Sequence, residues 1–240
     1  MRVQLQPAYL LHQRPYRDTS RILEVLTRDH GRVSVFARGA RASRKGAPAS
    51  TSMLQPFNRL LLSWTARAEA GQLAGVEFDG PVSVLPADRL VSGFYLNELL
   101  LKLLARHDSH PEIFELYAQT IESLKIAPEM QRPLRIFEKR LLEALGYGLG
   151  LERDAASGLA IQPDAAYHYH MERGPIRASG VAEGTLVFEG RMLISLAREQ
   201  LEDLDTCVHA RRLLRAALDR CLDGRELKSR QVMMALRNRK

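Results

Sequence analysis

Apolar and polar residues alternate with a period of two along several short segments in the first 80 residues of this 240-residue chain. In Gly31–Arg38, for example, Val33 and Val35 alternate with polar neighbours, which is typical of a half-buried strand. Segments of this kind predict five strands, over 3–13, 20–27, 31–38, 56–64 and 71–78. Five short strands in so short a stretch favour a small Greek-key barrel. The oligonucleotide-binding (OB) fold is the leading interpretation and an SH3-like barrel is the alternative.

After Pro81–Pro86 the apolar residues recur three or four positions apart, which is the period of a helix. This pattern predicts helices over 88–106, 111–124, 128–145, 191–202, 206–222 and 226–237. We expect Asp88 to be the N-cap of the first helix and Pro111 to open the second. The stretch 150–184 is irregular, with a strand-like pattern only near Tyr167–Met171, and we interpret it as an inserted hairpin or small subdomain.

The two periodicities together predict an α+β protein of two domains. An N-terminal five-stranded OB-fold β-barrel covers residues 1–80, and an all-α helical domain with a small irregular insertion covers residues 81–240. Cys207 and Cys221 are separated by 14 positions on one predicted helix, about 21 Å at 1.5 Å per residue, which is too far for a disulfide. Free thiols, with neither a signal peptide nor an apolar run of membrane-spanning length, predict a cytoplasmic protein with no membrane partner.

Charge is distributed along the chain in three blocks. The formal net charge of +7 is the sum of +8 in residues 1–60, −8 in residues 61–205 and +7 in residues 206–240. A polyanion held by the two ends of the chain explains such blocks better than solubility does. The loop 39–51 adds long cations to small residues, a composition suited to a phosphate backbone, although a solvated hairpin loop is the alternative.

Eight basic residues of the barrel domain are therefore expected to contact phosphates. The first tier is Arg32, Arg38, Arg41, Arg44 and Lys45, and the second tier is Arg14, Arg17 and Arg21. Aromatic residues of the same domain are available to stack on bases, with core packing as the alternative for each: Tyr9, Tyr16, Phe36, Phe57 and Trp64.

The helix predicted over 128–145 has a basic side opposite its apolar side. The basic residues are Arg132, Arg135, Lys139 and Arg140. Such a face either accepts an acidic peptide from another protein or is simply solvated.

The sequence contains no catalytic motif. It lacks the phosphate-binding loop of ATPases, the GxSxG motif of esterases and the HExxH motif of metalloproteases, so we expect neither enzyme activity nor a cofactor, and we assign no catalytic residue. His168 and His170 alternate with tyrosines and would point to the same side of a strand, as a metal pair requires. No cysteine or third histidine lies nearby, which favours two exposed histidines over a metal site.

Seven short motifs, in this order and near this spacing, give the chain a resemblance to the RecO family of bacterial DNA repair and recombination mediators. They are YRDTS (16–20), LTRDHG (26–31), ARGA (37–40), LQPF (54–57), GFYLNEL (93–99), LGYG (145–148) and LKSR (227–230). Each motif is weak alone, but together they cover most of the chain.

The resemblance implies an N-terminal OB barrel, a helical domain and a role in the RecF pathway. It implies that the protein binds single- and double-stranded DNA near the nucleoid, anneals complementary strands, partners RecR and helps to load RecA on DNA coated by single-strand binding protein. On this basis the basic side of 128–145 is expected to bind the acidic C-terminal tail of single-strand binding protein. The family often carries a four-cysteine zinc module, but 150–184 contains no cysteine, so the chain resembles the zinc-free branch.

Two other functions stay open at this point. One is a sequence-specific DNA-binding regulator with an OB-like domain, which would select one duplex over random DNA. The other is a hydrolase whose site is assembled from distant residues.

Overall fold

The computed structural model describes residues 2–17, 20–38, 53–65, 70–82, 84–179 and 186–237. The chain divides into two compact units, Met1–Ile126 with Glu226–Lys240, and Ala127–Arg225. This grouping differs from a division at residue 80, because the first helices after the strands pack on the strands and are joined by the C-terminal helix.

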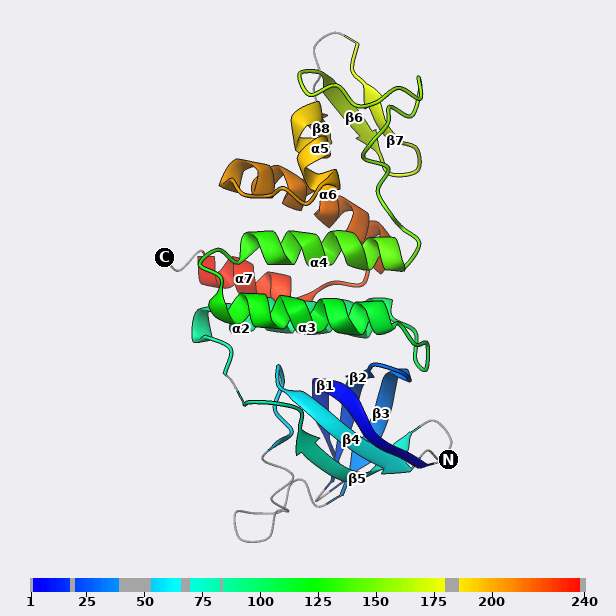
Figure 1. Ribbon diagram of the computed structural model, residues 1–240, viewed down its shortest axis with the longest axis vertical. Helices are drawn as coiled ribbons and strands as arrows, with labels where there is room; N and C mark the ends of the chain where they lie inside the picture. Colours follow the sequence, from blue (N-terminus) through cyan, green and yellow to red (C-terminus); the bar gives the residue numbers. More distant parts are fainter. Residues whose placement is uncertain are drawn as a thin grey trace. The chain divides into compact units, whose positions relative to one another are not determined.

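The first unit begins with five strands: β1 (Arg2–Tyr16), β2 (Ser20–Thr27), β3 (Gly31–Ala37), β4 (Arg59–Thr65) and β5 (Gly71–Phe78). They form a closed barrel in the order β1-β2-β3-β5-β4 (Figure 1). β1 is long enough to pair with both β2 and β4, and a short parallel pairing of β3 with β5 closes the ring. The predicted five-stranded OB-type barrel is confirmed.

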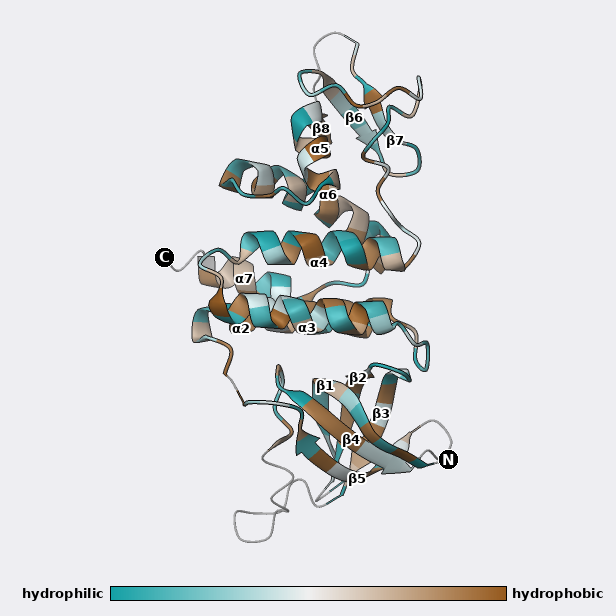
Figure 2. Ribbon diagram, in the orientation of Figure 1, coloured by the Kyte–Doolittle hydropathy of each residue, from teal (hydrophilic) through white to brown (hydrophobic). Residues whose placement is uncertain are grey.

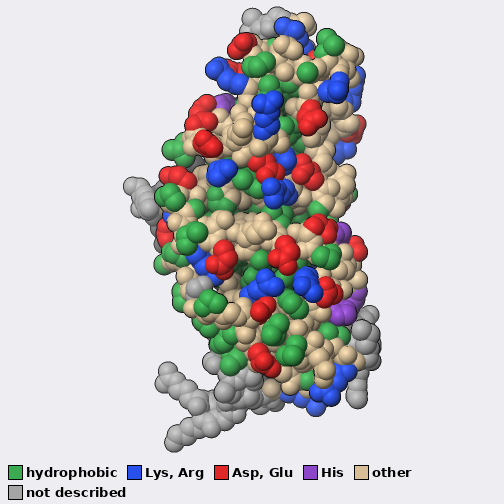
Figure 3. Space-filling view, viewed as in Figure 1, with side chains coloured by type: hydrophobic (Ala, Val, Ile, Leu, Met, Phe, Trp, Pro, Cys, Tyr) green, Lys and Arg blue, Asp and Glu red, His purple; other side chains and the backbone are tan. Residues whose placement is uncertain are grey.

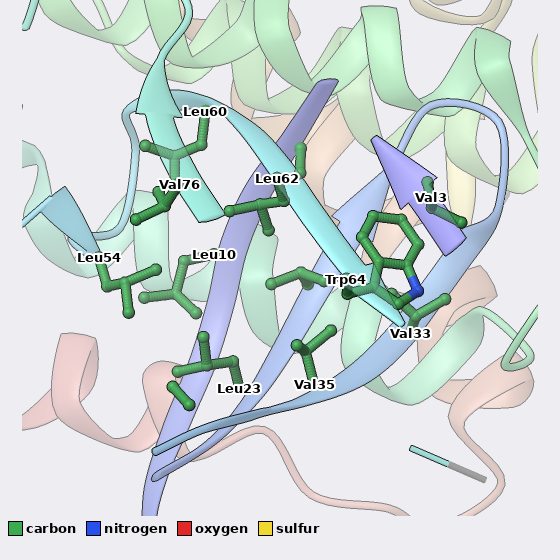
Figure 4. Packing of buried hydrophobic residues seen from close by; sticks show 13 residues of the cluster. Val3, Leu10, Leu23, Val33, Val35, Leu54, Leu60, Leu62, Trp64 and Val76 are labelled. Atoms are coloured by element: carbon green, nitrogen blue, oxygen red, sulfur yellow. The ribbon is translucent and has the colours of Figure 1, made fainter. Parts of the chain in front are cut away.

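Alternation along the strands fills the barrel interior. Leu10 of β1, Leu23 of β2, Val35 of β3, and Leu62 and Trp64 of β4 lie close to one another in the core (Figure 4). The predicted alternation in β3 is correct for Val33 and Val35, which are buried. Side chains between these inward positions must therefore lie on the outer face of the barrel.

The first unit also contains the short 3-10 helix η1 (Ala87–Arg89), α2 (Leu90–Leu103), α3 (Pro111–Ile126) and α7 (Lys228–Arg237). Pro111 opens α3 as predicted. The prediction for Asp88 is wrong, because this residue lies inside η1 and the N-cap of α2 is Arg89. Hydrophobic and hydrophilic residues are interspersed along α3 (Figure 2), and its buried positions include Phe114 and Tyr117.

A buried polar contact ties α2 and α3 to β1. The Tyr117 hydroxyl donates to Asn97 Oδ1 at 2.6 Å, and Asn97 Nδ2 donates to the Leu11 carbonyl at 2.9 Å. Tyr9 lies against this pair, with its ring centroid 4.9 Å from that of Tyr117, and burial raises the pKa of Tyr9 to about 12. These bonds hold the helices on the barrel within the first unit.

The C-terminal helix is attached through a carboxylate from α2. Glu98 accepts hydrogen bonds from the backbone amides of Lys228 and Ser229, both at 2.9 Å, and from the Ser229 hydroxyl at 2.7 Å. The carboxylate thus caps the amino end of α7, where unpaired amides favour negative charge. Burial raises the pKa of Glu98, but the hydrogen bonds from Ser229 and Lys228 outweigh it, so the pKa is lowered overall.

The second unit contains α4 (Gln131–Ala144), α5 (Gly190–Ala197) and α6 (Leu204–Leu222), with α6 packed against α4. Its three-stranded sheet has the order β7-β6-β8, from β6 (Ala166–His170), β7 (Gly174–Arg177) and β8 (Val187–Glu189). The hairpin expected near Tyr167–Met171 is β6–β7. Cys207 and Cys221 lie on α6 as free thiols, as expected.

A buried aspartate organises the segment before β6. Asp154 accepts from the amides of Ala156 at 2.7 Å, Ser157 at 2.9 Å and Arg177 at 2.8 Å. These bonds lower the pKa of Asp154, those from Ser157 and Arg177 most of all. Packing and hydrogen bonds thus fix the fold of this segment.

Candidate nucleic-acid interface

Four side chains share the outer face of the barrel where β1, β2 and β3 run together. Phe36 of β3 lies opposite Ile22 of β2, which in turn lies opposite Arg14 of β1. Tyr16 is two residues beyond Arg14 on the same face. In OB folds the face of strands 2 and 3 and the loop joining strands 1 and 2 are the usual oligonucleotide surface.

Tyr16 and Phe36 form an aromatic pair on this face. Their ring centroids are 5.2 Å apart with the planes inclined by 52°, and both side chains are half-buried. Ile22 on the middle strand is buried although it points outward, which fits two rings lying on either side of it. Arg17 lies beside the pair, its Cζ 5.2 Å from the centroid of Tyr16. Tyr16 and Phe36 are called the aromatic platform below.

Cations surround the aromatic platform. Arg14, Arg17 and Arg38 are exposed, whereas Arg21 is half-buried and donates from Nη1 to Gln13 Oε1 at 2.8 Å. The other predicted phosphate contacts in the loop, Arg41, Arg44 and Lys45, lie outside the described residues.

Arg32, the remaining first-tier residue, is bound inside the protein. Its Nη1 lies 3.2 Å from Glu24 Oε2, and its Nε and Nη2 donate to the Leu104 carbonyl at 3.3 and 3.1 Å. Only 14% of the side chain is exposed, and burial lowers the pKa of its guanidinium. A phosphate at Arg32 would have to replace these bonds.

The Glu24 carboxylate also binds a second cation, Arg106, and the hydroxyl of Ser34. Glu24 Oε1 accepts from Arg106 Nη2 and from the Ser34 hydroxyl, both at 2.6 Å. Ser34 is therefore buried, contrary to the half-exposed polar side expected for β3. Two guanidiniums thus neutralise the single acid in the row next to the aromatic platform, which removes its repulsion of a polyanion.

The loop between α2 and α3 packs closely against the β2–β3 turn, and this contact brings Arg106 to Glu24. A Cβ on Gly31 would lie 2.0 Å from the carbonyl oxygen of Asp108, and the φ of Gly31 is +64°. Only glycine fits there. The amide of His107 donates to the Arg32 carbonyl at 3.0 Å in the same contact.

The five predicted stacking residues fall into two groups. Tyr9, Phe57 and Trp64 are buried, so core packing, the alternative weighed for each, applies to these three. Tyr16 and Phe36 remain at the surface. The sequence held no sign that these two meet, because their contact depends on the strand register.

The basic residues of α4 do not form a single exposed face. Arg132 and Arg140 are exposed, but Arg135 is only 3% exposed and Lys139 is also buried. Arg135 Nη2 lies 2.5 Å from Oε1 of the buried Glu138. The helical wheel assigned all four residues to one exposed face, but Arg135 and Lys139 are buried. The wheel does not include the packing of α6 on α4.

Lys139 and Arg140 of α4 are also paired with acids. Lys139 Nζ lies 2.9 Å from Glu143 and 3.1 Å from Glu199, and Arg140 holds Glu199 through Nε at 3.0 Å and Nη2 at 2.6 Å. Lys, Arg, Asp and Glu side chains are correspondingly interspersed on the face of the molecule in Figure 3.

His168 and His170 lie on β6 as expected, half-buried and exposed respectively. Within the described residues there is no group of three or more His, Cys, Asp or Glu side chains that could hold a metal ion. In the same part of the chain, every helix is too short or too polar to cross a membrane.

Comparisons with known proteins agree over nearly the whole chain. Residues 1–79 match the family model of the recombination protein O N terminal region, and residues 87–231 match that of its C terminal region. The chain is 45% identical to the DNA repair protein RecO of Nitrosococcus oceani over 99% of this chain and 95% of that protein. Identity to the RecO of Methylococcus capsulatus is 43%, over 96% and 93% of the two chains. Identity to that of Alkalilimnicola ehrlichii is 44%, over 98% and 92%. The chain belongs to the RecO family of DNA repair proteins.

Proposed function

We propose that this protein is a recombination mediator of the RecF pathway that binds single- and double-stranded DNA through its barrel and anneals complementary strands. The observation that carries the proposal is the outer barrel face, where exposed arginines surround an aromatic pair and Glu24, in the neighbouring row of the sheet, is neutralised. Membership of the RecO family supports the same function.

The mechanism needs no bond chemistry. Two DNA strands repel each other through their phosphates, and a surface with an excess of cations lowers that repulsion while base edges stay free to pair. Arg14, Arg17 and Arg38 supply this charge among the described residues, with Arg21 at the edge of the site. Binding is therefore sensitive to salt and nearly independent of base sequence.

The protein partners belong to the same proposal. It acts with RecR and helps to load RecA on DNA that single-strand binding protein coats. The acidic C-terminal tail of single-strand binding protein binds beside α4, where Arg132 and Arg140 are exposed. The support for this docking place is charge complementarity. An acidic peptide there has to compete with Glu199 of this chain, which already pairs with Lys139 and Arg140.

Paired charge variants test the DNA surface. R17Q/R38Q removes two exposed cations of the barrel face, and R173Q/R198Q removes two exposed cations of the second unit, so both variants have the same net charge. Fluorescence anisotropy at several salt concentrations measures the affinity for single strands and for duplex. We expect R17Q/R38Q to weaken both and to reduce the salt slope by about 1.4 for single strands and about 1.8 for duplex, at about 0.7 and 0.9 per lost phosphate contact.

The control variant should bind and anneal as the wild type does. Equal salt slopes for R17Q/R38Q and wild type would remove the barrel face from the proposal. A wild-type protein that failed to accelerate strand annealing would overturn the mediator function itself.

A further inference from the structure

We infer that the aromatic platform stacks on unpaired bases, so that this surface distinguishes single-stranded from double-stranded nucleic acid. The inference rests on the proposed function and adds what the arginines alone do not provide. Phosphate contacts treat single strands and duplex alike, whereas stacking needs a base whose face is free.

The geometry of Tyr16 and Phe36 suits stacking. The rings belong to strands separated by β2, yet their centroids approach to 5.2 Å, so both lean over the middle strand. Ile22 beneath is already buried, so the rings have an apolar support on one side and solvent on the other. Half-buried aromatic rings on a charged outer face offer a surface that any of the bases can cover.

Charge around the rings favours a nucleotide over another apolar ligand. Arg17 approaches the Tyr16 ring, and Arg14 and Arg38 lie within two residues of a platform ring along their own segments of chain. A stacked base places its own phosphates a few ångströms from its ring, where these cations lie. Glu24, in the next row of the sheet, is held by Arg32 and Arg106. The site is therefore apolar in the centre and positive at the rim.

Duplex cannot use the rings in this way. Its bases are stacked on one another and expose only their edges in the grooves, so an aromatic side chain must first unstack a step. A single strand has no such barrier. The aromatic platform thus adds affinity for single strands and leaves duplex binding to the arginines.

The decisive variants are Y16L and F36L, with F94L as the matched control. Phe94 is 46% exposed on α2, in the same unit, and pairs with Phe57 at 5.1 Å, so its replacement also removes a surface ring that touches another aromatic. We expect Y16L and F36L to weaken binding to a single-stranded oligonucleotide about tenfold, with duplex affinity and salt slope unchanged. F94L should change neither affinity.

Two further measurements test the inference even if a leucine variant does not fold. Y16F and F36Y keep the rings and should keep the affinity for single strands. The wild-type protein should bind an oligonucleotide with several abasic sites about tenfold more weakly than the intact oligonucleotide of the same length. Equal affinity for the abasic strand, or equal losses for single strand and duplex in Y16L and F36L, would overturn the inference. The arginine variants would still show the salt effect in that case, so the proposed function would stand.

Discussion

The outer face of the barrel and helix α4 both looked basic in the sequence, but the structure uses their cations differently. On the barrel face, Arg14 and Arg38 are exposed, and Glu24 in the neighbouring row has both Arg32 and Arg106 as partners. On α4, most cations have acids of the same unit as partners: Arg135 with Glu138, Lys139 with Glu143 and Glu199, and Arg140 with Glu199.

Under the proposed function, this difference means that a polyanion site depends on the surplus of cations over adjacent carboxylates more than on the number of cations in a segment. Coulomb energy between neighbours about 3 Å apart exceeds that from a distant ligand, so a paired arginine contributes little to an external field. The variants that follow each change one of these pairings.

The largest effect is expected inside α4. Glu138 is 2% exposed and faces Arg135, whose Nε and Nη1 have no hydrogen-bond partner among the described residues. Glu138→Ala leaves a buried guanidinium without its counter-ion, which costs about 3–5 kcal/mol in the free energy of unfolding. Urea denaturation measures this loss. Glu202→Ala, at an exposed position of the same unit, should cost less than about 0.5 kcal/mol.

A loss below about 1 kcal/mol for Glu138→Ala would mean that the pair is not held in a desolvated site, and the contrast between α4 and the barrel face would weaken. Below the unfolding temperature, DNA binding by the variant should equal that of the wild type, since the barrel is unchanged.

The second-largest effect is expected from a variant that makes the barrel face more positive. Glu24→Gln keeps acceptors for Ser34 and Arg106 but leaves two guanidiniums without a negative charge. We expect a loss of about 2–3 kcal/mol in unfolding free energy, as for hydrogen bonds to charged groups. Affinity for DNA should rise and its salt dependence steepen, because the freed charge is available to phosphates.

Glu77→Gln is the control for this variant, because Glu77 is an exposed acid of the same barrel and its loss changes net charge equally. If both variants raised DNA affinity to the same extent, net charge alone would explain the result and the position of Glu24 would not matter.

The sequence predicted most of what depends on local periodicity. The bounds of β2 and β5 and the start of α3 follow from alternation and from Pro111. The prediction for Asp88 failed because a 3-10 turn precedes α2, and capping rules apply only once the first residue of a helix is known.

Contacts between distant segments could not be predicted in this way. Arg32 meets Leu104 and Glu24 meets Arg106 only after the loop following α2 reaches the β2–β3 turn. The meeting of Tyr16 with Phe36 likewise requires the register of three strands. Residue types thus identified the candidates, and tertiary packing decided which of them are available to a ligand.

The smallest effect is expected at Glu199, which pairs with Lys139 and Arg140 of α4. The hydrogen bond from Arg140 lowers the pKa of Glu199, burial opposes this, and Lys139 adds to the lowering. Because the folded-state pKa lies below the ordinary value of 4.5, the ionised carboxylate stabilises the fold above about pH 4.5. This contribution is lost as the pH falls through the folded-state pKa. Glu199→Gln should therefore cost about 1 kcal/mol at pH 7, and the difference from wild type should shrink below pH 4.5.

The same variant also tests whether α4 is available to an acidic partner. With Glu199 neutral, Arg140 and Lys139 lose a competing carboxylate, so an acidic peptide should bind a few-fold more tightly while DNA binding at the barrel stays constant. Glu202→Gln, at an exposed position three residues further along the chain, removes one charge nearby and should leave peptide affinity unchanged. If Glu199→Gln did not change peptide affinity, the acidic tail would have to bind away from Arg140. The α4 cations would then serve only to hold the second unit together, in contrast to those of the barrel face.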